Sequence, residues 1–186
     1  MTVGTHNLLA KRMYPILHEQ YGAAFSRRTF ALGSIWPDIA PSLRMLNHNL
    51  EDLTPVISRY IQIACHPGSD SHTVGMALGI VCHCVADIFN LAHNSPQYKR
   101  RVKAHLCYEL RQQQYFSKCT LHWHRTPLSP QDMGAYVGKL HTSFMGGIIS
   151  YELEWELTVR VCLDLCTGVL CCREEAHLPY ARTAGA

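Results

Sequence analysis

The residues best suited to a chemical role in this sequence are two pairs, each made of one histidine and one acidic residue. His83 and Asp87 lie four positions apart in HCVADIFNLAH, and His105 and Glu109 repeat that spacing in HLCYE. Residues four apart project from nearly the same face of a helix, one turn apart, so each pair can share one ion. His93 follows Asp87 by six positions, on another face or past the helix end, where it would hold a second ion. Imidazole nitrogen and carboxylate oxygen together suit zinc.

A single pair of this kind is also typical of a salt bridge or of a hydrogen-bonded core histidine. Here the two pairs and the third histidine between them lie within one segment of 27 residues that is otherwise largely apolar. Charged side chains that are buried in such a segment require a charged partner or a metal ion. Upstream, Asp38, His48 and His6 add three candidates. If they are not metal ligands, Asp38 forms a turn or caps a helix, His48 lies on the surface, and His6 lies in a first helical turn. Together the eight residues suffice for two or three ions.

The segments that contain these residues are predicted to be helical, because no alternating strand pattern occurs along the chain. Thr5 or Asn7 is expected to cap the first helix, Gly22 to end it, and Asn49 to cap the third. Gly33, Pro37 and Pro41 predict an irregular connection that presents Asp38 from a loop. Glycines at 75 and 79 indicate a central helix that neighbours approach closely. We expect helices over residues 8–21, 24–32, 50–65, 72–91, 98–118 and 131–170, the last interrupted near 146–147.

Length and composition favour one domain. The chain has 186 residues, of which 47% are hydrophobic, enough for one substantial core. We expect an all-α, single-domain multi-helix bundle over residues 1–172 around a multinuclear metal site, with a flexible tail over 173–186. The net charge of +3 is too weak to diagnose a nucleic-acid binder.

The compartment is predicted from cysteines and from the first residues. Nine cysteines, an odd number, accompany no recognisable secretory signal, which favours reduced thiols and a cytoplasmic protein. The longest apolar stretch, residues 74–86, is too short to cross a bilayer, so no transmembrane segment is expected.

The order and spacing of the eight candidates resemble the zinc-dependent phospholipase C family and, more distantly, the single-strand nucleases with three zinc ions. That order is a histidine near the start, an aspartate on a loop, a histidine, His-x3-Asp-x5-His, and finally His-x3-acid. It falls over about residues 5–110 on His6, Asp38, His48, His83, Asp87, His93, His105 and Glu109.

The resemblance implies a division of ligands among two to three Zn²⁺ ions. Asp38, His48, His83 and Asp87 would hold one ion, and His93, His105 and Glu109 another. Asp87 would bridge to a third ion bound by His6. Water between the ions would be the nucleophile, and Asp38 would orient or deprotonate it. Exported members add the amine of an N-terminal tryptophan to the third ion, whereas this sequence starts Met1-Thr2.

The function that the resemblance implies is hydrolysis of a phospholipid or a related phosphodiester by metal-activated water. One alternative is cleavage of single-stranded nucleic acid, for which the basic run Lys99, Arg100, Arg101 and Lys103 beside His105 would be the attracting patch. That run is otherwise a solvated helix face, or a site of peripheral contact with an anionic membrane. A second alternative is a metal-stabilised binding protein without catalysis. Serine-elbow, Walker and HExxH motifs are absent from the sequence.

Overall fold

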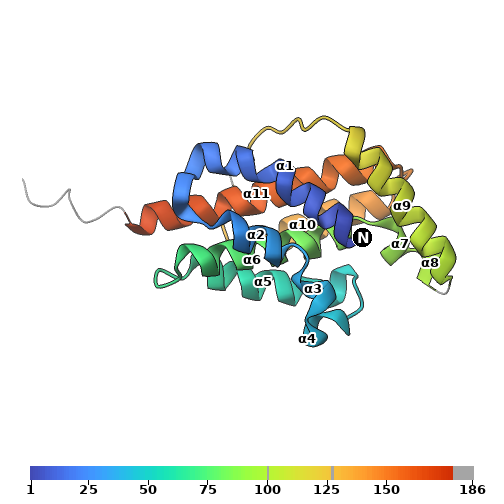
Figure 1. Ribbon diagram of the computed structural model, residues 1–186, viewed down its shortest axis with the longest axis horizontal. Helices are drawn as coiled ribbons and strands as arrows, with labels where there is room; N and C mark the ends of the chain where they lie inside the picture. The colour runs from blue at the N-terminus through green and yellow to red at the C-terminus, as the bar shows by residue number, and fades with distance from the viewer. Residues whose placement is uncertain (100, 127, 178–186) are drawn as a thin grey trace, which may run out of the picture.

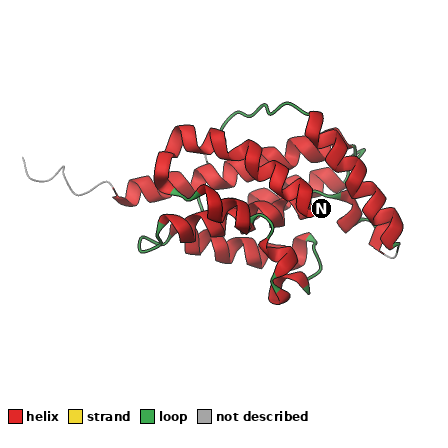
Figure 2. Ribbon diagram, viewed as in Figure 1, coloured by secondary structure: helices red, strands yellow, loops and turns green. Residues whose placement is uncertain are grey.

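A computed structural model describes residues 1–99, 101–126 and 128–177. Every regular element in this part of the chain is helical, which confirms the predicted all-α bundle (Figure 2). The elements are α1 (Val3–Tyr21), a 3-10 turn (Gly22–Ala24), α2 (Arg27–Gly33), α3 (Trp36–Ile39), α4 (Pro41–Arg44), α5 (Leu50–Cys65), α6 (Ser71–Ile88), α7 (Leu91–Asn94), α8 (Pro96–Lys99), α9 (Val102–Lys118), α10 (Met133–Met145) and α11 (Tyr151–His177).

Helix α6 is the centre of the bundle, with α2, α5 and α11 packed around it (Figure 1). Its side chains from residues 77 to 88 are all buried. A β-carbon placed on Gly79 would lie 2.3 Å from the backbone oxygen of Phe30, and one on Gly75 would lie 2.6 Å from that of Ser26. The two glycines therefore allow α2 to lie directly on α6, which confirms the predicted close approach.

The helix starts follow side-chain caps, with one correction. The Asn49 side chain accepts a hydrogen bond from the Asp52 amide, as predicted. The first helix, in contrast, is capped by Thr2, whose hydroxyl accepts from the Thr5 amide at 3.1 Å. The prediction of Thr5 or Asn7 was wrong because the helix begins at Val3, so both residues lie within it and Thr2 occupies the position before it. Gly22 ends the helix at φ 51°.

The segment around Asp38 is more regular than predicted. It forms two single-turn helices, and Asp38 lies on α3 rather than on a loop. Pro37 and Pro41 cause this, since proline is favoured in the first turn of a helix, where its missing N–H is not needed. Each proline occupies such a position, Pro37 in α3 and Pro41 in α4.

The last predicted helix divides as expected into α10 and α11, but α11 continues to His177, five residues into the segment predicted as a tail. Buried Arg173 accounts for this, because its guanidinium donates to the carbonyls of Ala64, His66 and Ser69 at 2.7–2.9 Å. Residues 178–186 of that predicted tail lie outside the described residues.

Among the described residues, α6 alone is long and apolar enough to cross a membrane, with a mean hydropathy of 1.3. Of its 18-residue window, 78% is buried within the bundle. The core helix of a soluble protein meets the same criteria, so length and composition do not make α6 a membrane span.

Candidate metal centre

All eight residues predicted from the sequence meet around Asp87, in the last turn of α6. They form three groups, and within each group the ligand atoms lie within 4.8 Å of one another. His83 belongs to two of them. The groups are His6, His83 and Asp87; Asp38, His48 and His83; and His93, His105 and Glu109.

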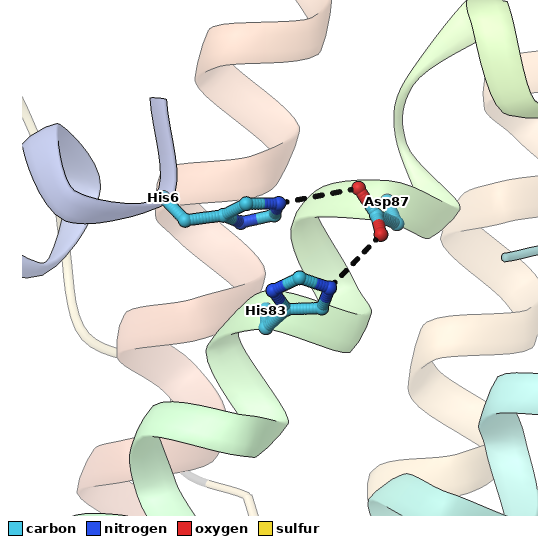
Figure 3. Close-up of side chains that lie close together, drawn as sticks. All are labelled: His6, His83 and Asp87. Carbon is cyan, nitrogen blue, oxygen red and sulfur yellow. Dashed lines mark ion pairs between the residues drawn. The ribbon is translucent and has the colours of Figure 1, made fainter. Parts of the chain in front are cut away.

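The carboxylate of Asp87 lies where the groups meet. Its Oδ1 is 3.5 Å from His6 Nε2 and 3.4 Å from His93 Nε2. Its Oδ2 is 3.1 Å from His83 Nε2 and 2.5 Å from His48 Nδ1. Asp87 and His83 project from successive turns of α6, as their spacing predicts, and His6 reaches the same carboxylate from α1 (Figure 3). One buried carboxylate is thus shared by four imidazoles.

The third group is built from the short helix α7 and from α9. Glu109 Oε1 lies 2.9 Å from His105 Nε2, one turn earlier on α9, and 3.2 Å from His93 Nε2 on α7. His93 also faces Asp87, so it joins this group to the others. Its position on α7 agrees with the second of the two predicted positions, past the end of the Asp87 helix rather than on another of its faces.

Asp38 occupies the outer edge of the centre. Its Oδ1 lies 3.8 Å from His83 Nε2, and its side chain is partly exposed. Burial raises the pKa of Asp38 despite the opposing effect of His83. The eight side chains together form one continuous array of oxygen and nitrogen atoms.

A family model described as zinc dependent phospholipase C matches residues 5–151. The chain belongs to this family. The match confirms the resemblance drawn from the ligand order, and it includes all eight residues. Neither the curated proteins nor the solved structures contain a match to the chain. Membership supports a phosphodiester-cleaving function in general terms.

The zinc on which this family depends fits the residues present. His6 Nδ1 and Nε2, His83 Nε2 and Asp38 Oδ2 are buried without a hydrogen-bond partner among the described residues. An unsatisfied buried polar atom costs about 1–3 kcal/mol, so four in one cluster indicate a missing partner. Zinc accepts imidazole nitrogen and carboxylate oxygen, so bound ions would satisfy His6 Nε2, His83 Nε2 and Asp38 Oδ2.

His83 and His6 are held in the form that binds a metal. His83 Nδ1 lies 2.9 Å from the backbone carbonyl of Ser34. Donation of the Nδ1 proton to that carbonyl leaves the Nε2 lone pair directed at Asp87, an arrangement common among metal-binding histidines. Burial, reinforced by the neighbouring His83, lowers the pKa of His6 to about 3. A neutral imidazole is the ligand form.

The Met1 amino group also lies at this centre. It donates to the Asp87 carboxylate and lies 2.8 Å from His93 Nε2 and 3.2 Å from Glu109 Oε1. Burial opposes ionisation of Glu109, but hydrogen bonds from His105 and His93 and the charge of this amine hold its pKa well below the usual range. The amine therefore neutralises part of the carboxylate charge.

Sequence reasoning missed Glu154, a buried residue of α11 that supports the third group. Its carboxylate accepts from the Leu91 amide at 2.7 Å, from the Tyr108 hydroxyl at 2.7 Å and from Gln112 Nε2 at 2.6 Å. These bonds fix the first residue of α7 and two residues of α9. A signal existed, because Glu154 shares the helical face of the core residues 158, 161 and 165.

Proposed function

We propose that this protein is a zinc-dependent phosphodiester hydrolase that acts on a phospholipid or a related phosphodiester. The observation that supports this most strongly is the sharing of one buried carboxylate, Asp87, by ligand groups sufficient for two or three ions. Two or more close ions suit phosphodiester cleavage, because they can stabilise both the attacking and the leaving oxygen. A single structural zinc requires only one closed set of four ligands.

Access to the centre is uneven, and this favours a catalytic over a structural role. The side chains of His6, His83 and Asp87 are fully buried. Those of Asp38, His48, His93 and His105 are between 13% and 26% exposed. Catalytic metal sites keep a position open to water or substrate, whereas structural sites are closed. The exposed edge lies between α3 on one side and α7 and α9 on the other.

We assign roles to the residues as follows. Asp38, His48, His83 and Asp87 would hold one ion, and His93, His105 and Glu109 another, while Asp87 and His6 would hold a third. The bound zinc would supply Lewis acidity and lower the pKa of water. Asp38 orients the attacking water and accepts its proton, since it is the most exposed of the three ligand carboxylates, at 26% against 1% for Asp87 and 6% for Glu109. Ser34 and Glu154 hold the ligands in place.

A comparison of substrates tests the proposal. The zinc-loaded protein is expected to release the phosphorylated headgroup from a short-chain, soluble phosphatidylcholine and to leave single-stranded DNA intact. Asp38→Asn should lower kcat more than it lowers zinc content. Cleavage of DNA in place of the lipid would favour the nuclease alternative. If zinc-loaded protein cleaves neither, a metal-stabilised binding protein becomes the better account.

A further inference from the structure

The outer face of α9, beside the metal centre, carries an unusual row of exposed apolar side chains. Val102, Leu106 and Leu110 lie one turn apart and are between 50% and 74% exposed. They fall four residues apart, so they form a single line along the helix. His105 and Glu109 directly precede Leu106 and Leu110 in the sequence. The apolar row therefore runs beside the two metal ligands of α9.

Positive charge borders this row. Arg101, Lys103, Arg111 and Lys118 are all exposed. The one acidic residue within Val102–Lys118, a range that the structure describes completely, is Glu109, and it is buried in the metal centre. The solvent-facing surface of α9 thus combines leucine and valine with lysine and arginine and carries no carboxylate. This pattern is typical of helices that lie in the plane of an anionic lipid surface.

A second apolar edge lies across the metal centre. Ile39, next to Asp38, is 53% exposed, and Met45, three residues before His48, is 84% exposed. Figure 1 shows α3 and α4 on one side of the N-terminal end of α1, and α8 and α9 on the other. The exposed ligands Asp38 and His105 are thus flanked by apolar side chains from two separate parts of the chain.

We propose that α9 and the α3–α4 segment dock the protein on an anionic phospholipid surface, with the open edge of the metal centre facing that surface. Leu106 and Leu110 enter the boundary between headgroups and acyl chains, while Lys103 and Arg111 contact lipid phosphates. Met45 inserts from the opposite edge. The proposal rests on the proposed function for its choice of a lipid, but docking itself requires no hydrolysis. A protein partner is disfavoured because the apolar side chains form narrow lines with charged borders.

Cosedimentation with vesicles tests this surface. Full-length protein, with and without zinc, is mixed with vesicles of phosphatidylcholine alone or with added phosphatidylglycerol. Binding should depend on phosphatidylglycerol and persist without zinc. The pair Lys103→Gln and Arg111→Gln should weaken it about 30-fold, at about fivefold for each charge. The matched pair Arg28→Gln and Arg59→Gln should bind like the wild type.

The apolar row is tested in the same assay. Leu106→Ser with Leu110→Ser should weaken binding about 30-fold, since each leucine has about half of its surface left to bury. Methionine at both positions keeps the apolar area and should preserve binding. Equal unfolding temperatures show that both pairs remain folded.

Two results would overturn the docking surface. One is wild-type vesicle binding by the serine pair. The other is a concentration-dependent dimer in light scattering that the serine pair abolishes, which would assign the face to a second copy of the chain. Failure of the proposed function has a different signature, because zinc-loaded protein would then leave a soluble phosphodiester intact whatever its vesicle binding.

Discussion

Replacing Asp87 by asparagine removes the group on which the metal centre converges. The substitution keeps the shape but eliminates the charge and replaces one oxygen by an NH2 group that cannot bind a metal. The apparent free energy with which small domains bind a structural zinc ion is about 10–16 kcal/mol at neutral pH. One ligand among four then accounts for about 3 kcal/mol, or roughly 100-fold in affinity. Because Asp87 Oδ1 faces His93 of one group and Oδ2 faces His48 of another, we expect more than one ion to bind at least that much more weakly.

The assay is zinc content and affinity, measured by elemental analysis and by competition with a chromophoric chelator. Asp164→Asn is the matched control. Asp164 is also buried, but its carboxylate accepts from Trp123 Nε1 and from the Thr126 amide at 2.9 and 3.1 Å, remote from the ligands. That variant should lose stability and keep its zinc affinity. An Asp87→Asn protein with wild-type affinity and stoichiometry would refute the role of this carboxylate.

Glu109→Gln should lower the zinc stoichiometry by one ion, because Glu109 contacts the histidines of one group alone; elemental analysis showing no loss would contradict that grouping. Burial raises the pKa of Glu154 from 4.5 to about 6 against three donated hydrogen bonds. Its contribution to the free energy of unfolding is therefore complete below about pH 4.5 and is lost as the pH rises through 6. Over this rise in pH, the zinc-free wild type should lose about 2 kcal/mol of stability relative to zinc-free Glu154→Gln. If denaturant titrations give the same difference in free energy of unfolding between the two proteins at pH 4.5 and above pH 6, the raised pKa of Glu154 is excluded. Gly79→Ala should cost about 1–3 kcal/mol by forcing α2 away from α6, whereas Gly138→Ala, with open space around its β-carbon, should stabilise α10 by about 1 kcal/mol; similar unfolding midpoints would argue against the close helix contact.

The central part of the fold was predictable because it rests on local signals. The apolar run over residues 74–86 predicts a buried core helix, and Gly75 and Gly79 predict its close neighbour. The four-residue spacing of His83 and Asp87 places both side chains on one face without any tertiary information. These features depend on helical geometry alone.

Other features depend on tertiary contacts that the sequence does not display. Arg173 looks like part of a charged, frayed end, yet it is buried and donates to the carbonyls of Ala64 in α5 and of His66 and Ser69 after it. In YELEWEL only the shared face with core residues 158, 161 and 165 distinguishes Glu154 from the other two glutamates, and its hydrogen bonds to α7 and α9 required the fold. For the site, the residue types and their order were predictable. The convergence of four imidazoles on Asp87 required the fold.

Above all, we propose that the Asp87 carboxylate gathers zinc ions that cleave a phosphodiester. The most direct measurement is a titration of metal-free protein with Zn²⁺ while hydrolysis of a soluble phosphatidylcholine and bound zinc are followed together. We predict no turnover without metal and a rise to a plateau at two to three equivalents of zinc. Full turnover by metal-free protein, or a fully loaded protein that leaves the phosphodiester intact, would contradict the claim.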